Sequence, residues 1–176
     1  MQTPLVLTVL GRDRTGLVES LARLVTDHGG NWLESRMCRL GGEFAGILRL
    51  HVPNDRQTAF IGALEKLKEQ GLAIVARPDV STSAGASSQK SLMSLDLVGH
   101  DRPGIVRQVT AALARHGVNV EELTTECASA PMSGEELFKA EAKVLVPESC
   151  DMQMLRQDLE KIAADLMVDL RLAPVD

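Results

Sequence analysis

The chain has 176 residues, enough for one average domain or two small ones, and its 44% apolar and 24% charged residues exclude wholesale disorder. Its formal net charge of −5 divides into +1 over residues 1–82 (10 basic, 9 acidic) and −6 over residues 83–176 (9 basic, 15 acidic), so neither half has the basic surface that nucleic-acid binding requires. With one Trp, three Phe and no Tyr, the chain also has few rings for stacking on bases, and we expect no direct contact with nucleic acid.

The chain opens with a predicted strand and helix. The short apolar run Leu5–Leu10 predicts a buried strand bounded by Gly11. Over Thr15–His28, apolar residues recur at helical spacing, so we expect an amphipathic helix that Asp13 or Thr15 caps. Glycine ends the helix at residues 29–30. The residues of its apolar stripe are Leu17, Val18, Leu21, Leu24 and Val25.

Four further elements complete the first half. The expected elements are a strand over Asn31–Arg39, a strand over Phe44–Val52 after a Gly41-Gly42 hairpin turn, a helix over residues 57–70 and a strand over Leu72–Val80. One face of the third strand is predicted to be buried: Phe44, Gly46, Leu48, Leu50 and Val52. The second helix has Phe60, Leu64 and Leu67 as its stripe, and Gly71 ends it.

The second half repeats the first. At a shift of 88 residues, many positions are identical, and after six extra residues Phe44 matches Phe138 and Pro53 matches Pro147 at a shift of 94. The extra residues place the main difference between the copies in the segment Ala128–Gly134. The identical pairs include Gly11/Gly99, Asp13/Asp101, Arg14/Arg102, Gly16/Gly104, Val18/Val106, His28/His116, Gly29/Gly117 and Asn31/Asn119.

The repeat predicts two α+β domains of the ferredoxin-like βαββαβ type, each a four-stranded antiparallel sheet with two helices on one face. The small, polar stretch Ser81–Gln89 predicts an exposed linker. We place the domains at residues 1–80 and 91–176, with the linker at 81–90. The other sheet face is expected to meet water, because the third strand turns Ala45, Ile47 and Arg49 that way in copy one, and Lys139, Glu141 and Lys143 in copy two.

The turn between the first strand and the first helix suits a small polar ligand. Helix N-termini expose N–H groups that favour a carboxylate, and an Asp in the turn can accept hydrogen bonds from an ammonium group. Together with the flanking pattern Gly-x-Asp-Arg-[Thr/Pro]-Gly-[Leu/Ile]-Val and the later His-Gly-x-Asn, this turn resembles the ACT domain, a small regulatory ligand-binding module.

The resemblance implies an amino-acid site at this turn and at the start of the second strand, usually where two modules meet. The implied site can be assigned residue by residue to matching positions in both copies. Some amino-acid-sensing members have His at the position of Gly11 and Gly99, and Asn at that of the turn aspartates, so their binding mode does not transfer directly. The candidate ligand-binding residues are Asp13, Arg14, Gly16, Leu17 and Asn31 in copy one, and Asp101, Arg102, Gly104, Ile105 and Asn119 in copy two.

Each of these residues also has a structural interpretation. The aspartates can be helix caps, the glycines can permit close helix–sheet packing, and the asparagines can form local hydrogen bonds. Arg14 and Arg102 are either solvated or pair with a carboxylate of a ligand or partner. His28 and His116 lie at a helix C-terminus, where a cation is favourable, and we do not expect them to bind ligand or metal.

No nucleophile–base arrangement or phosphate loop is present in the sequence, so we expect no enzyme, cofactor or metal. The resemblance instead implies a regulatory protein that senses a small amino acid and acts on a transcriptional activator through protein contact. The amino acid that the resemblance implies is glycine. The alternatives are a regulatory subunit of a metabolic enzyme, or an uncharacterised enzyme that uses the linker cleft. We also expect a homo-oligomer, because each sheet leaves an edge and an open face.

The three cysteines, Cys38, Cys127 and Cys150, are too few and too irregularly spaced for a disulfide framework or a zinc site. The apolar run Pro4–Leu10 is too short to span a bilayer, and it lacks the flanks of a signal peptide. The sequence therefore predicts a cytoplasmic protein with reduced thiols and no membrane contact.

Overall fold

The computed structural model describes residues 1–69, 71–80, 90–129 and 135–175. The chain divides into two compact units, Met1–Gly85 and Ala86–Asp176. The proposed linker and most of the segment 128–134 lie outside the described residues, so neither expectation is tested there.

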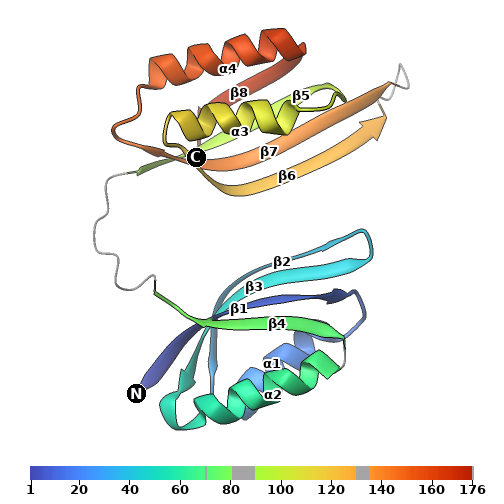
Figure 1. Cartoon of the computed structure of the whole chain (residues 1–176), viewed down its shortest axis with the longest axis vertical. Helices are drawn as coiled ribbons and strands as arrows, with labels where there is room; N and C mark the ends of the chain where they lie inside the picture. Colours follow the sequence, from blue (N-terminus) through green and yellow to red (C-terminus); the bar gives the residue numbers. More distant parts are fainter. Residues whose placement is uncertain (70, 81–89, 130–134, 176) are drawn as a thin grey trace. The chain divides into compact units, whose positions relative to one another are not determined.

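The first unit consists of one antiparallel sheet and two helices in the expected βαββαβ order. Its sheet has the strand order β2-β3-β1-β4, and both helices cover the same face (Figure 1). The elements are β1 (Gln2–Arg12), α1 (Leu17–Asp27), β2 (Asn31–Leu40), β3 (Glu43–Pro53), a short 3-10 turn (Asn54–Arg56), α2 (Gln57–Glu69) and β4 (Leu72–Pro78).

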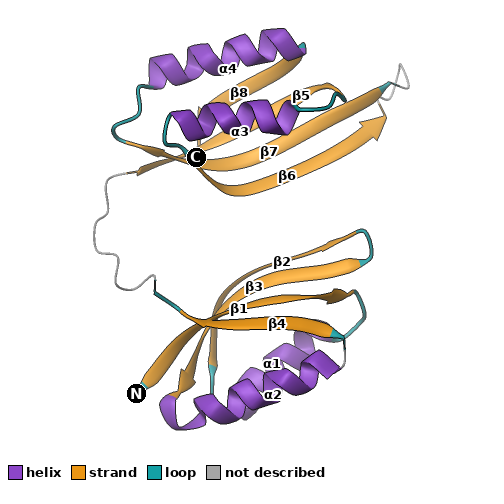
Figure 2. Cartoon of the chain, viewed as in Figure 1, coloured by secondary structure: helices purple, strands orange, loops and turns teal. Residues whose placement is uncertain are grey.

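The second unit repeats this arrangement, with the strand order β6-β7-β5-β8 and both helices again on one face (Figure 2). The side chain of Asp151 caps its last helix, because one carboxylate oxygen accepts from the N–H groups of Gln153 and Met154 at 2.9 and 3.1 Å. The elements are β5 (Lys90–His100), α3 (Ile105–Arg115), β6 (Asn119–Ser129), β7 (Glu136–Pro147), α4 (Met152–Leu166) and β8 (Val168–Pro174).

Each unit has its own apolar core between the sheet and the helices. The predicted face of β3 is buried, as are the α2 stripe and three of the five α1 stripe residues, Leu17, Leu21 and Val25. Leu24 is half-buried at the edge of the core. The prediction for Val18 was wrong: this residue is 45% exposed, because the buried residues of α1 are spaced four apart from Leu17 and Val18 lies about 100° around the helix from that line.

Glycine at the end of each first strand allows a close approach of two strands. A Cβ on Gly11 would lie 2.8 Å from the Gly71 carbonyl oxygen, and one on Gly99 would lie 2.8 Å from Cβ of Val168. Both distances are shorter than normal van der Waals contact. A larger residue, such as the His of some ACT domains, therefore does not fit at Gly11 or Gly99 without a shift of β4 or β8.

An unpredicted β-bulge occurs at the same place in both units. The pairing of β2 with β3 shifts between Trp32 and Glu34, and that of β6 with β7 shifts between Val120 and Glu122. After the bulge, a carboxylate faces a cation across the strands in both copies: Glu34 and Arg49 at 3.5 Å, and Glu122 and Lys143 at 2.8 Å.

Candidate functional site

The predicted site turns, residues 13–16 and 101–104, each connect the end of a strand to the start of a helix. Gly16 and Gly104 precede α1 and α3 with φ of 91° and 96°, in the left-handed region that favours glycine. The Gly16 carbonyl oxygen accepts the first helical hydrogen bond from Ser20, and that of Gly104 accepts from Gln108. The backbone conformation is therefore the reason for glycine here.

Two structural interpretations of the turn were wrong. Neither Asp13 nor Thr15 caps α1, and Asp101 does not cap α3, because a left-handed glycine precedes each helix and no side chain bonds to its first N–H groups. Close packing does not explain Gly16 either, since a Cβ there would meet nothing within 4 Å. The N–H groups at both helix starts thus have no side-chain partner from the cap residue, which leaves them to water or to an anionic ligand.

Asp13 connects the turn to the β2–β3 hairpin. Its N–H donates to the Gly42 carbonyl oxygen at 2.9 Å, and its carboxylate pairs with Nε of Arg39 at 2.7 Å. Sequence reasoning did not find Arg39, because it lies 26 positions along the chain and nothing in its local pattern marks it as a partner of the turn.

The second copy keeps the backbone contact but not the ion pair. The N–H of Asp101 donates to the Glu136 carbonyl oxygen at 3.1 Å, and Cys127 replaces Arg39. Partial desolvation of the thiol, with added repulsion from Asp101 and Glu136, raises the pKa of Cys127 although the residue is exposed. The Asp101 carboxylate has no ion pair with any residue that the structure describes. Of the two turns, the second therefore has the carboxylate that is more accessible to a cationic group.

The asparagines do not lie beside the turn of their own unit. Asn31 on β2 pairs with His51 on β3, and His51 pairs with Pro4 near the start of β1. The turn lies at the other end of β1, after Arg12. Eight residues of β1 separate the two levels, or about 26 Å. The second unit has the same arrangement, and there the Asn119 amide donates to Oε1 of Glu121 at 2.5 Å. One domain alone does not bring the turn and the asparagine together.

The other candidate residues divide between core and surface. Leu17 and Ile105 are 3% and 2% exposed, and their side chains pack in the cores. As the first residues of α1 and α3, they present their backbone N–H groups at the start of the helix. Arg14 and Arg102 are exposed. An open hollow of about 420 Å³ lies at the start of α3, and its lining includes Arg102, Gly104, Arg107 and Phe138.

The histidines have structural roles. Nδ1 of His28 lies 2.8 Å from the Leu24 carbonyl oxygen, and its ring packs edge-on against Phe60. Nε2 of His116 lies 2.9 Å from Oδ2 of Asp158. Within the described ranges, no group of three His, Cys, Asp or Glu side chains is placed to hold a metal ion.

The described parts of the chain include no helix that is both long and apolar enough to cross a membrane. All three cysteines are free thiols, and Cys38 and Cys127 are exposed.

Family models agree with this architecture. One model described as "ACT domain" matches residues 3–77, and a second with the same description matches residues 93–138. The chain belongs to the ACT-domain proteins and consists of two such domains in tandem.

Among individual proteins, the chain is similar to the glycine cleavage system transcriptional repressor of Escherichia coli (strain K12). The identity is 27% over 165 residues, which is 92% of this chain and 85% of the repressor, and the protein of the same name from Shigella flexneri matches equally. A crystal structure of an unknown protein from Galdieria sulphuraria is 30% identical, with a TM-score of 0.87 over 100% of both chains. The similarity thus extends over both domains and supports a regulatory role.

Proposed function

We propose that the chain is a non-enzymatic regulator of glycine cleavage genes, which binds a small amino acid, glycine by resemblance, and modulates a transcription factor through protein contact. The observation that carries this proposal is the similarity over 92% of the chain to a repressor of that system. The two ACT domains and the two glycine-bounded turns support it, because the turns offer N–H groups for a carboxylate.

The geometry also indicates how such a site is built. Because each turn and the asparagine of the same unit lie about 26 Å apart, a site that combines them needs the turn of one module and the second strand of another. Binding of the amino acid would then stabilise one arrangement of modules, which is a direct route from ligand to partner.

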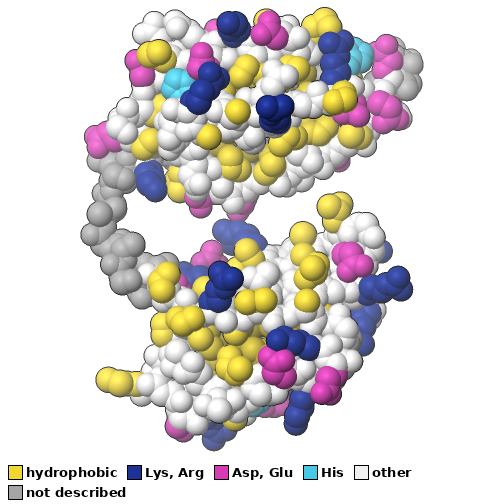
Figure 3. Space-filling model, in the orientation of Figure 1, with side chains coloured by type: hydrophobic (Ala, Val, Ile, Leu, Met, Phe, Trp, Pro, Cys, Tyr) yellow, Lys and Arg dark blue, Asp and Glu magenta, His cyan; other side chains and the backbone are white. Residues whose placement is uncertain are grey.

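A protein partner has a suitable surface on the first unit. On the sheet face away from the helices, Ile47 and Val75 flank Thr8 in one row across three strands, and Leu10 lies in the next row. Leu10, Ile47 and Val75 are 48%, 52% and 51% exposed, and apolar side chains are visible at the surface of this unit in Figure 3. Exposed apolar patches of this kind are typical of protein-contact sites.

The second unit does not have this apolar surface. Glu141, Asp96 and Arg171 take the positions of Ile47, Thr8 and Val75. This charged row fits the predicted water-facing sheet face, whereas the first unit departs from it.

Calorimetry with the whole chain and a panel of free amino acids tests the ligand. We expect glycine or a similar small amino acid to bind, and Asp101→Ala to weaken binding at least tenfold. Asp96→Ala, a charge-matched change on the sheet face of the same unit, should leave binding unchanged. The absence of heat with every amino acid would contradict the sensing part of the proposal.

Co-purification from native extract, with the captured proteins identified by mass spectrometry, tests the partner. We expect a transcription factor, and its loss in the double variant Ile47→Glu, Val75→Glu. Val18→Glu, at a similarly exposed apolar residue on α1, is the control. Capture of a metabolic enzyme in its place would favour a regulatory subunit and contradict the transcriptional role.

A further inference from the structure

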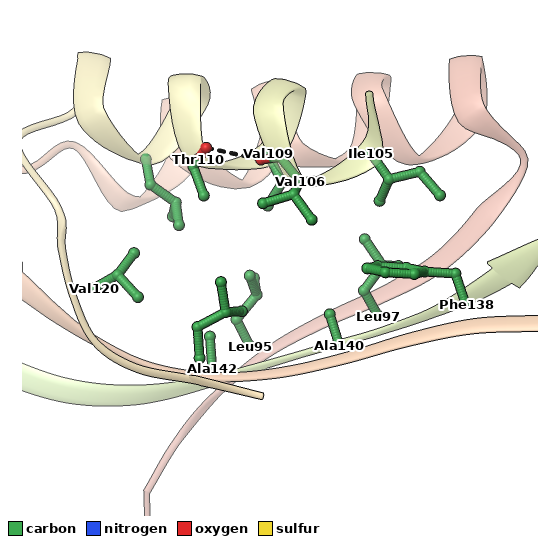
Figure 4. A pocket seen from close by; sticks show the side chains of 12 residues that line it. Leu95, Leu97, Ile105, Val106, Val109, Thr110, Val120, Phe138, Ala140 and Ala142 are labelled. Atoms are coloured by element: carbon green, nitrogen blue, oxygen red, sulfur yellow. Dashed lines mark hydrogen bonds between the residues drawn. The ribbon is translucent and has the colours of Figure 1, made fainter. Parts of the chain in front are cut away.

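A small apolar cavity lies beneath α3 of the second unit (Figure 4). Its volume is about 20 Å³, and it separates Val106 and Val109 on the helix from Val120 and Ala142 on the sheet. The hydroxyl of Thr110, at the helix side, donates to the Val106 carbonyl oxygen at 2.7 Å. The lining therefore offers hydrocarbon, without a free polar group to hold water.

In the first unit, some of the corresponding lining positions have a larger side chain and others, such as Ser35 in place of Leu123, a smaller one. Trp32 replaces Val120 and Leu48 replaces Ala142 in the lining, and beside the lining Met37 replaces Thr125. Trp32 and Met37 pack against the core there. Met37 lies close to Gly46, its partner on β3, because a Cβ added to Gly46 would be 2.7 Å from Cγ of Met37. The side chains of Trp32 and Leu48 thus take up, in the first unit, part of the space that the cavity occupies in the second.

The cavity shares a wall with the open hollow at the start of α3. Ile105, Val106 and Phe138 line both spaces, and the hollow adds Arg102 and Arg107. Neither arginine forms an ion pair or hydrogen bond within the described part of the chain.

The charge at this hollow also differs between the copies. In the first unit, Arg14 corresponds to Arg102 and Glu19 corresponds to Arg107. The Glu19 carboxylate forms an ion pair with Arg23 at 3.7 Å. The second unit has two cationic side chains where the first has a cation and an anion. A carboxylate is therefore favoured next to α3 and not next to α1.

We propose that the second unit binds a small amino acid with an aliphatic side chain, such as valine or leucine, in preference to glycine. This inference rests on the proposed amino-acid binding at the turn and specifies which copy binds and which class of side chain it selects. The carboxylate lies against Arg102 and Arg107, and the aliphatic group enters beneath α3. Because about 20 Å³ holds little more than one water, the half-buried Phe138 ring must swing outward to admit it.

Calorimetry of the whole chain with glycine, alanine, valine and leucine tests the selectivity. Each buried methylene raises affinity about fourfold. Because the displacement of Phe138 costs part of this gain, we expect the affinity for leucine to be at least tenfold higher than that for glycine. We expect one leucine site per chain. Equal affinities for glycine and leucine would overturn the inference and leave amino-acid binding intact. Absence of binding by all four would overturn both.

Variants that copy the first unit locate the site. Val120→Trp should abolish the preference for leucine and keep glycine binding within twofold, whereas Arg107→Glu should weaken all amino acids that bind. Val98→Trp, which adds the same ring on the other face of the sheet, is the matched control. Ala142→Leu fills the cavity from β7 and replaces Val120→Trp should that variant fail to fold. A leucine preference that persists in a folded, cavity-filled variant would overturn the inference.

Discussion

The left-handed conformation of Gly16 leads to a prediction about stability. An L side chain at φ of 91° is strained, so Gly16→Ala should destabilise the first unit by about 1–2 kcal/mol, although a methyl group would touch nothing there. Gly62→Ala is the control, because Gly62 lies in the interior of α2 without a positive φ, and alanine should stabilise the helix by about 0.5–1 kcal/mol. Urea unfolding of both variants measures the difference, and equal effects would contradict the account.

The pair His116–Asp158 predicts a pH dependence in the second unit. The hydrogen bond from His116, helped by the charge of Arg115, holds the pKa of the Asp158 carboxyl below its ordinary value of 3.8. A carboxyl whose pKa is lowered on folding stabilises the fold above its unfolded pKa, and this contribution is lost as the pH falls through the folded pKa.

We therefore expect Asp158→Asn to lower the Tm of the second unit at pH 5–7, and the difference from wild type to shrink below about pH 4. Thermal unfolding followed across this pH range measures the effect. Asp165→Asn, an exposed change on the same helix, is the control. A Tm difference that stays constant from pH 7 to pH 2 would show that the carboxylate charge is not involved.

The sequence predicted the positions of the two turns better than the contacts that the turns make. The turns lie between the predicted strands and helices, because glycine and the flanking apolar runs mark these boundaries locally. The Asp13–Arg39 pair, the distance from each turn to its asparagine and the cavity beneath α3 depend on strand register. Register is fixed by long-range pairing, which a local pattern does not contain.

At the scale of elements, the approach of β8 to β5 is the most sensitive contact. A methyl group on Gly99 would meet Cα and Cβ of Val168 at 2.9 and 2.8 Å, so Gly99→Ala should destabilise the second unit by about 1–3 kcal/mol. A Cβ on Gly99 would also meet Cγ1 of Val168, which Val168→Ala removes, so the double variant should be more stable than the sum of the two single losses predicts. Chemical denaturation of all three variants measures this coupling, and strict additivity would contradict it.

Helices and strands were predicted closely where the period of apolar residues was uninterrupted. The α2 stripe and the buried face of β3 are examples. The bulge at residues 32–34 was missed because apolar Leu33 hides the extra residue, and the bulge at residues 120–122, where the extra residue is Glu121, was missed as well. Leu33 is 43% exposed, and after it the inward positions move by one residue. The cap of α1 was also misassigned, since the glycine that follows Asp13 takes the position at which a side chain would cap the helix.

At the scale of the whole molecule, the two cores share no residue among those described. Leu64 and Leu159 are 2% and 1% exposed, one in each core. Truncating a buried leucine to alanine costs about 2–5 kcal/mol. We therefore expect Leu64→Ala to lower the thermal transition of the first unit alone, and Leu159→Ala that of the second.

Differential scanning calorimetry of the two leucine variants and the wild type measures these transitions. Hydrogen exchange assigns each transition to its unit. A common downward shift of both transitions in either variant would show that the units unfold as one cooperative body.

The shared bulge shows what the two units have in common. The same irregularity, followed by the same cross-strand ion pair, occurs in both halves although the residues around it differ: Trp-Leu-Glu in one and Val-Glu-Glu in the other. Because different residues bend at the same step, the local residues alone do not set the bulge, and it belongs to the strand geometry that the two units share. The units therefore differ in the side chains that fill the interior, a large ring in one and valine in the other, and keep the same backbone path.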